Sequence, residues 1–144
     1  MSPHGWNGAA PIFRVRELRA SLDYYQSTLG FKLDWHAGGI ASVSRDHCCI
    51  FLCEGDQGRA GTWAWVGVDD AEALCDELRH RGAVIRHPPT NYEWALEMQV
   101  ADLDGNVLRL GSEPIPDAPI GDWLDASGRL WRRDGGEWSE VESE

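Results

Sequence analysis

The chain has 144 residues, which is the size of one domain with a substantial hydrophobic core. Hydrophobic residues make up 42% of it and charged residues 26%, a balance that is typical of globular proteins and excludes a disordered chain. The formal net charge of −11 argues against a nucleic-acid partner or an anionic membrane surface, because both would be repelled.

The N-terminal segment MSPHGWNGAAPIF has neither a basic start nor a long apolar stretch, and no apolar run elsewhere has the length of a membrane span. We therefore expect a cytoplasmic protein without a membrane partner. The cysteines Cys48, Cys49, Cys53 and Cys75 do not have the spacing of a metal or redox site. They are expected to be reduced thiols that serve mainly in packing.

The first half of the chain is predicted to form a strand, a helix and three further strands. The first strand is expected at residues 11–16 and the helix at residues 18–29, where apolar residues recur on one helical face. Gly30 then ends the helix, because glycine readily adopts the left-handed conformation found after a helix. The three strand-like runs that follow cover residues 32–36, 39–44 and 48–53.

The second half repeats this order. A strand is expected at residues 62–68, and a helix at residues 71–81 that starts after Asp69 and Asp70 and stops at Gly82. Three strands follow, near residues 83–87, 94–101 and 106–111. The repeat predicts an α+β fold made of tandem βαβββ modules, at about residues 9–55 and 60–113.

A separate C-terminal extension is predicted at residues 114–144. Three closely spaced prolines, Pro114, Pro116 and Pro119, interrupt regular structure and mark the boundary with the domain at residues 9–113. Beyond them, turn residues at 127–128 and 134–136 separate short strand-like runs. These features predict a β-hairpin or β-meander that contains Trp123, Trp131 and Trp138.

Four motifs in the predicted repeat resemble a known superfamily. They are Val15-Arg-Glu-Leu-Arg-Ala-Ser21, Tyr24-Tyr25 with Leu29-Gly-Phe31, Val68-Asp-Asp70, and Asp102-Leu-Asp-Gly-Asn106 with Val107-Leu-Arg-Leu110. In this order they are similar to the vicinal oxygen chelate superfamily, which comprises glyoxalases, dioxygenases and bleomycin-resistance proteins. The resemblance implies an open, cupped mixed sheet and a homodimer with two ligand clefts, whereas the motifs themselves describe architecture and not a reaction.

In metal-using relatives the first and last strands of each half supply histidine or glutamate ligands. Carried over by the resemblance, these positions fall on Ala10, Phe51, Trp63 and Arg109, and none of these side chains coordinates a metal. A register error of one residue would bring in side chains that are equally unable to bind metal. We therefore expect no metal and no cofactor.

The residues at these positions suggest a ligand cleft instead. Strand alternation puts Trp63 and Trp65 on one face, and Cys49 and Phe51 on one face. Largely apolar walls with a few polar groups are typical of small-molecule sites. The predicted ligand-binding residues are Trp63, Trp65, Phe51, Arg109, Trp35, Trp94, Cys49 and Glu97. Two alternatives stay open, because the tryptophans could fill a core and Arg109 could pair with Glu97, Glu93 or a C-terminal acid.

Three functions are consistent with these features. The first is a metal-free binding protein of the bleomycin-resistance type, in which a homodimer sequesters an aromatic or cationic, antibiotic-like small molecule by stacking and cation–π contact. The second is a metal-independent lyase or isomerase on the same scaffold, for which Glu97 is a candidate general base. The third is an interaction module without a ligand, in which the Trp-rich extension mediates assembly.

Overall fold

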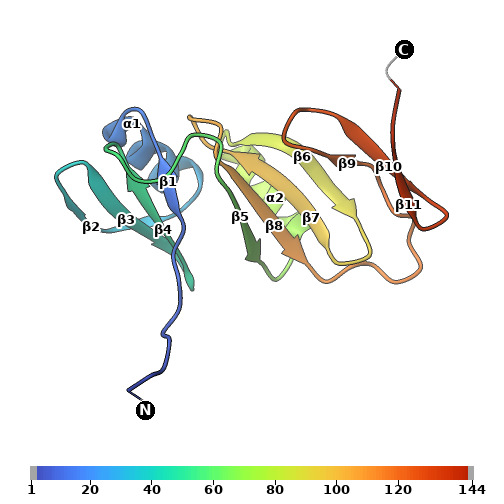
Figure 1. Cartoon of the computed structure of the whole chain (residues 1–144), viewed down its shortest axis with the longest axis horizontal. Coiled ribbons are helices and arrows are strands. Elements are labelled where there is room, and N and C mark those ends of the chain that lie inside the picture. The colour runs from blue at the N-terminus through green and yellow to red at the C-terminus, as the bar shows by residue number, and fades with distance from the viewer. Residues whose placement is uncertain (1–2, 143–144) are drawn as a thin grey trace. The chain divides into compact units, whose positions relative to one another are not determined.

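A computed structural model describes residues 3–142, which form two compact units. The first unit comprises residues up to 64 together with 102–107, and the second comprises 65–101 together with the chain from 108 onward. Residues 3–142 contain two four-stranded sheets, two α-helices and one three-stranded sheet, so the expected α+β class is confirmed (Figure 1). No helix within residues 3–142 is long and apolar enough to cross a membrane.

The first module has the predicted element order. Its elements are β1 (Ile12–Arg14), α1 (Leu18–Asp23), the π-helical turn η1 (Tyr24–Thr28), β2 (Lys32–Ala37), β3 (Ile40–Arg45) and β4 (Cys48–Cys53). The strand order in the sheet is β1-β4-β3-β2, with β1 parallel to β4 and the other neighbours antiparallel. The module is therefore one βαβββ unit with a mixed, open sheet.

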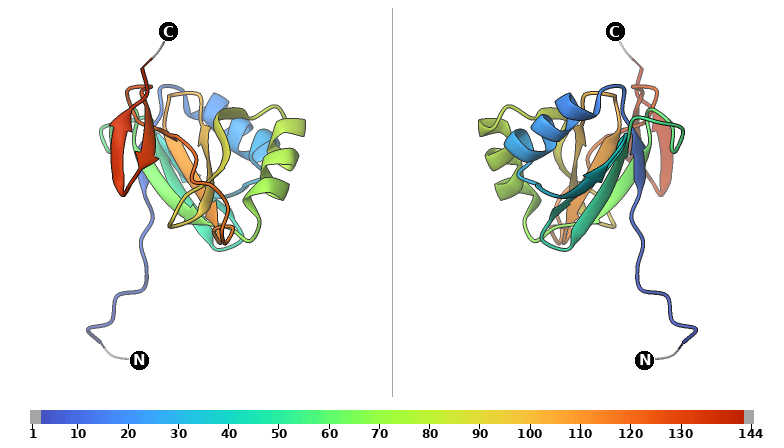
Figure 2. Two further views of the ribbon diagram at one scale, coloured as in Figure 1. Left: turned by 90° about the vertical axis from the view of Figure 1, so that its right-hand side faces the viewer. Right: turned by 90° about the vertical axis from the view of Figure 1, so that its left-hand side faces the viewer.

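Alternation along the strands separates the two faces of this sheet. Val43, Ile50 and Leu52 are fully buried, and α1 packs against β3 and β4 (Figure 2). Phe51, between two buried neighbours on β4, points to the other face and remains half-exposed. The helix thus covers one face, and the face that carries Phe51 remains available for other contacts.

The second module repeats the arrangement. It consists of β5 (Trp63–Gly67), α2 (Ala71–His80), β6 (Val84–Asn91), β7 (Leu96–Ala101) and β8 (Val107–Ser112), in the sheet order β5-β8-β7-β6. Helix α2 starts as predicted, because the Asp70 carboxylate accepts a hydrogen bond from the Ala73 backbone N–H at 3.1 Å. Gly82, at φ 87°, follows the helix as predicted.

Two elements differ from the sequence prediction. The predicted helix at residues 18–29 is a short α-helix that continues as the π-helical turn η1. Strand β6 extends to Asn91, well beyond the predicted end at residue 87, although it contains Pro88 and Pro89. It tolerates them because it lies at the edge of the sheet and because its pairing with β7 is irregular around His87.

The Asp102–Asn106 motif forms the turn between β7 and β8. Asp102 Oδ1 accepts hydrogen bonds from the backbone N–H groups of Asp104 and Asn106, both at 2.9 Å. Its Oδ2 accepts one from the Tyr25 hydroxyl at 2.9 Å. Asn106 Nδ2 also donates to the Arg14 carbonyl at 3.0 Å. The motif thus connects this turn to η1 and to the end of β1 within the first unit.

Replacing Tyr25 with phenylalanine tests this connection. The hydrogen bond joins two buried groups, so we expect Tyr25→Phe to lower the free energy of unfolding by about 1.5–3 kcal/mol. Burial and the neighbouring Asp102 raise the pKa of Tyr25 well above its usual value. This tyrosine therefore stabilises the fold fully below about pH 10, and its contribution is lost at higher pH.

Urea denaturation at pH 7 and pH 10.5 measures both effects. Tyr24→Phe is the matched control, because Tyr24 is its neighbour in η1 but is not buried. An unchanged denaturation midpoint for Tyr25→Phe would show that the hydrogen bond contributes nothing.

The C-terminal extension forms the predicted β-meander. Strands β9 (Trp123–Leu124), β10 (Leu130–Asp134) and β11 (Glu137–Glu140) are antiparallel neighbours in the order β11-β10-β9. Gly135 and Gly136 make the β10–β11 turn with φ 57° and 87°, values that favour glycine. Residues 143–144 of the predicted extension lie outside the described part of the chain.

Asp125 organises the turn between β9 and β10. Its Oδ1 accepts from the backbone N–H groups of Ser127 and Arg129, at 2.9 and 2.8 Å. Its Oδ2 accepts from Trp131 Nε1 at 2.8 Å. These hydrogen bonds, led by the one from Trp131, hold the pKa of Asp125 far below its ordinary value. The carboxylate form is thus the one that the turn requires.

Acid should therefore loosen the meander only at very low pH. Because the pKa of Asp125 is depressed, its stabilisation is complete above about pH 4 and disappears as pH falls through the lower value of the folded state. The NMR chemical shift of the Trp131 indole N–H follows this titration, and Asp125→Asn should abolish it. A midpoint near the ordinary carboxyl pKa would contradict the role assigned to these hydrogen bonds.

Candidate functional site

A buried carboxylate lies at the centre of the second unit's aromatic cluster. Glu97, on β7, is only 1% exposed. Its Oε1 accepts hydrogen bonds from Trp94 Nε1 at 2.6 Å and from Trp65 Nε1 at 3.3 Å. Arg109 donates through Nε to Oε2 at 2.8 Å and through Nη2 to Oε1 at 3.2 Å. One carboxylate thus fixes two indoles and one guanidinium, which together balance its desolvation.

The indole of Trp65 lies over two glycines. A Cβ atom added at Gly111 would be 3.0 Å from the indole, and one added at Gly67 would be 3.4 Å from it. The absence of side chains at these positions lets the ring lie close to the strands, while the residue remains 53% exposed. Trp65 therefore presents a wide aromatic surface whose orientation is fixed by the glycines below it and by Glu97.

Trp94 is fixed in a similar way but has more aromatic neighbours. It stacks on Tyr92 with ring centroids 4.8 Å apart and planes 5° apart, and it contacts Trp123 and Trp138 at 6.1 and 6.2 Å. It is still 46% exposed. Burial raises the pKa of Tyr92 to about 12, so its hydroxyl is a neutral donor, to the Asp122 carbonyl at 3.0 Å.

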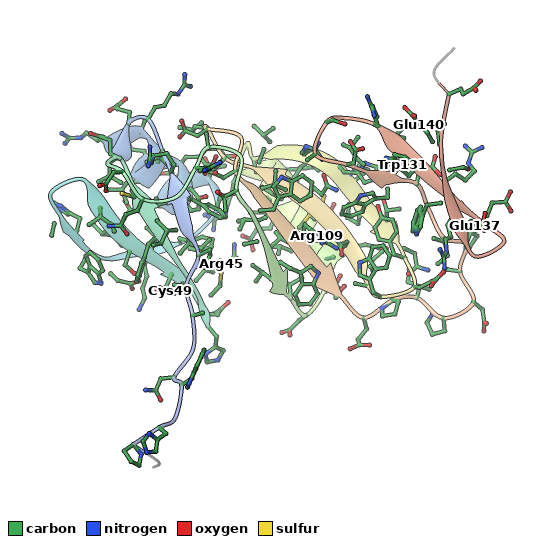
Figure 3. The ribbon with its side chains drawn as sticks, viewed as in Figure 1. Arg45, Cys49, Arg109, Trp131, Glu137 and Glu140 are labelled. Atoms are coloured by element: carbon green, nitrogen blue, oxygen red, sulfur yellow. The ribbon has the colours of Figure 1, made fainter. Side chains whose placement is uncertain are left out.

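Arg109 is paired within the chain. It lies on β8 in the second unit, beside the strands that carry Glu97 and Trp65 (Figure 3). Besides its two hydrogen bonds to Glu97, its guanidinium lies 4.7 Å from the centroid of the Trp123 ring. Of the partners that the sequence left open, Glu97 is the one observed.

A second aromatic site occupies the open sheet face of the first unit. The rings of Trp35 and Phe51 lie 5.7 Å apart in a tilted arrangement, and Trp35 is 46% exposed. The β2–β3 pairing is irregular between Leu33 and Trp35, so Asp34 forms a bulge. Asp34 and Trp35, although adjacent in sequence, thereby both interact with residues of the same sheet face.

Polar groups line this face next to the two rings. Asp34 accepts hydrogen bonds from the hydroxyls of Ser42 at 3.0 Å and Ser44 at 2.8 Å. The Ser42 hydroxyl also lies 3.3 Å from Cys49 Sγ. Each Asp34 oxygen keeps a lone pair free of these contacts, so the carboxylate can still accept a donor from a ligand. Cys49 is marked in Figure 3 on β4.

The predicted ligand-binding residues therefore fall into two groups. Trp65, Trp94, Arg109 and Glu97 meet in the second unit, whereas Trp35, Phe51 and Cys49 lie on one face of the first. Trp63 starts β5, where it is half-buried, and strand alternation gives it the same side as Trp65. Whether any of these residues contacts a ligand stays a prediction.

Two residues in these groups were not predicted from the sequence. Asp34 was missed because regular alternation would have placed it on the side opposite Trp35, and no sequence signal announced the bulge. Trp123 was assigned to the extension, and only the fold shows that it stacks on Arg109. A tryptophan in a short segment with little core of its own was the available signal, because such a side chain needs a surface to cover.

The metal positions implied by the fold do not fit a metal ion. Ala10 lies two residues before β1, Phe51 is in β4, Trp63 is in β5, and Arg109 is ion-paired to Glu97. Hydrocarbon, indole and guanidinium groups provide no lone pair for a cation. Among residues 3–142, moreover, no cluster of three or more His, Cys, Asp or Glu side chains could hold one.

Removal of Glu97 tests its role at the centre of the cluster. Glu97→Ala leaves Arg109 without its carboxylate and two indole N–H groups without an acceptor. Because Arg109 is partly exposed, we expect the lower end of the cost of breaking a buried ion pair, about 3 kcal/mol of unfolding free energy. Urea denaturation measures this loss.

Glu93→Ala is the matched control for Glu97→Ala. Glu93 pairs with Arg133 at 2.9 Å but is exposed, so its loss should cost at most about 1 kcal/mol. Equal effects of the two substitutions would argue against a central role for Glu97.

A family model and several solved structures are similar to this chain. The model described as Glyoxalase/Bleomycin resistance protein/Dioxygenase superfamily matches residues 9–110. No curated protein sequence matches the chain significantly.

Three of the similar structures illustrate the fold. TnmS3, an antibiotic binding protein from Streptomyces sp. CB03234, is 24% identical with a TM-score of 0.64, and the match covers 78% of this chain and 100% of that one. The bleomycin-binding protein from Streptomyces verticillus, complexed with copper(II)-bleomycin, is 23% identical with a TM-score of 0.65, over 75% and 97% of the chains. A glyoxalase/bleomycin resistance protein/dioxygenase from Nocardioides is 17% identical with a TM-score of 0.62, over 81% and 91%.

Proposed function

Since this chain belongs to the glyoxalase/bleomycin resistance protein/dioxygenase superfamily, we propose that it is a small-molecule binding protein that sequesters an aromatic or cationic, antibiotic-like ligand. Two of the similar structures are described as antibiotic-binding or bleomycin-binding proteins, which supports this class of ligand. Their sequences are less than 25% identical to this one, so the main support for a ligand comes from the residues of this chain.

One observation carries the proposal: large indoles remain about half-exposed while their orientation is fixed. Trp35 is next to Phe51, and Trp65 lies on glycines and donates to Glu97. A fixed ring loses little conformational entropy when it stacks on a flat ligand, so such rings are efficient binding surfaces. A tryptophan that served only as core would be buried instead.

The carboxylate beside Trp35 favours a cation. Asp34 adjoins Trp35 in the first unit, and a carboxylate beside an aromatic face attracts an ammonium or guanidinium group both directly and through cation–π contact. The net charge of −11 adds long-range attraction for positively charged molecules.

Glu97 supports binding better than catalysis. The sequence allowed it as the general base of a metal-independent enzyme, but its carboxylate is 1% exposed and accepts four hydrogen bonds from neighbouring side chains. A carboxylate engaged in this way within the chain is not available to take a proton from a substrate. Burial also raises the pKa of Cys48 and Cys75, so these thiols stay protonated and weakly nucleophilic at neutral pH.

The proposal retains a cytoplasmic homodimer, as expected from the sequence and its resemblance. Sedimentation velocity with and without ligand would test the dimer, and a strictly monomeric protein that still binds would restrict the proposal to binding within one chain.

Calorimetric titration tests the function itself. Metal-free bleomycin and a panel of aromatic and cationic natural products are titrated into the full chain, with and without a chelator. We expect saturable binding that the chelator leaves unchanged. Trp65→Ala and Trp35→Ala should each weaken it about tenfold, the loss of one well-placed stacking contact.

Trp6→Ala is the control for nonspecific effects of removing an indole, because Trp6 is 99% exposed. It should leave binding unchanged. An absence of saturable heat across the whole panel would refute sequestration, and equal losses in all three variants would refute the assigned residues.

A further inference from the structure

The sheet of the second unit has two chemically different faces. Met98 and Val100 of β7 are buried, and they belong to the face on which α2 packs. The alternate residues of the same strand, Glu97 and Gln99, are polar yet equally buried, at 1% exposure each. A face that is always covered would be more stable if it were apolar, so its buried polar groups require an explanation.

The cover of this polar face is the C-terminal extension. Backbone carbonyls around β9 meet side-chain donors of the sheet: Gln99 Nε2 donates to the Leu124 carbonyl at 2.8 Å, and Arg86 donates to the carbonyl of Asp125. The Asp122 carbonyl accepts from Tyr92 and lies 3.0 Å from His87 Nε2. The side chain of Trp123 meanwhile covers Arg109.

These contacts depend on a simple set of chemical groups, an aromatic ring with a carbonyl on each side. The sheet contacts three successive residues of the extension. Tyr92 and Gln99 donate to the carbonyl oxygens of the residues on either side of Trp123, and the Arg109 guanidinium lies against the Trp123 ring. Any molecule with an aromatic ring flanked by amide carbonyls offers the same groups. The extension is thus bound as a ligand would be bound.

The extension is attached to the sheet mainly by polar and ring contacts, with little buried apolar surface. Every residue from 112 to 142 is half-buried or exposed, so the three-stranded sheet has no core of its own. Segments with few buried apolar contacts open at low free-energy cost. The match to the family model ends at residue 110, before the extension begins.

We propose that residues 114–142 form a displaceable cover, and that the polar face of the β5-β8-β7-β6 sheet beneath them is a binding site for an aromatic amide, a ring flanked by carbonyl groups. The ligand replaces Trp123 over Arg109 and takes the donors of Arg86 and Gln99. This inference rests on the proposed function, because Glu97 joins Arg109 to Trp65, and it adds a displaceable cover and a class of ligand to that site.

A peptide copy of the cover is the direct probe. The acetylated, amidated peptide Gly-Asp-Trp-Leu-Asp, which has the sequence of residues 121–125, carries a fluorophore, and its binding to the full chain is followed by anisotropy. The tethered segment competes with it at the millimolar effective concentration typical of a short linker. Trp123→Ala weakens this competitor, so it should bind the probe at least about tenfold more tightly than the unchanged protein does.

A second set of variants opens the cover without removing Trp123. A Cβ atom at Gly121 would be 2.2 Å from Thr90 Cγ2, so Gly121→Ala pushes the extension away from β6 and should also tighten probe binding. Adding Thr90→Ser removes the clashing methyl group and leaves 3.7 Å to the Thr90 Cβ position. The double variant should therefore close again and bind the probe as weakly as the original protein.

The outcomes separate this inference from the proposed function. Three results together support the displaceable cover. The Trp123→Ala variant binds the probe more tightly, and a control peptide with alanine in place of tryptophan does not bind. The Trp6→Ala variant binds the probe as the unchanged protein does. Unchanged probe binding in a folded Trp123→Ala variant overturns it. Should that variant fail to fold, as judged by circular dichroism, unchanged binding by Gly121→Ala overturns it instead. The bleomycin titration tests the proposed function separately, so saturable bleomycin binding together with unchanged peptide binding overturns the displaceable cover alone.

Discussion

The second unit depends on a single buried carboxylate. Glu97 is placed by strand alternation on the face opposite the apolar residues of β7, where an unpaired charge would be very unfavourable. The fold compensates by directing Arg109, Trp65 and Trp94 toward it. A buried ion pair contributes less to stability than an apolar cluster of the same size, but it fixes geometry, because only one arrangement satisfies all of its donors.

The two modules use the same topology for different surfaces. Both have the strand order of a βαβββ unit with its helix on one face. In the first, the remaining face is left partly exposed, with Trp35, Phe51 and the Asp34 carboxylate. In the second, Glu97 and Gln99 of this face are buried, and a segment that follows the repeat contacts Gln99. A duplicated scaffold has thus diverged at its sheet faces, where chemistry can change without loss of the core.

The fold was predictable because its signals are local. The residues that begin a helix, the glycine that ends it and the alternation of a strand can each be recognised within a few positions. The boundaries of α2 at Asp70 and Gly82 illustrate this. The arrangement of the site was harder to predict from the sequence. That Glu97 is the partner of Arg109 was one of several options, and the stacking of Trp123 on Arg109 joins residues from a strand and from the extension. Contacts of this kind depend on tertiary packing, which periodicity does not report.

The bulge at Asp34 shows how a residue count can determine recognition. Because strands alternate with a period of two, the extra residue in β2 keeps Trp35 on the side of Phe51 while Asp34 stays beside the serines of β3. Deleting Asp34 would restore regular pairing with Trp35 still opposite Ser42, but it would remove the carboxylate that lies beside the ring. The length of this strand, and not only its residue types, therefore determines whether a carboxylate and an indole appear together on this face.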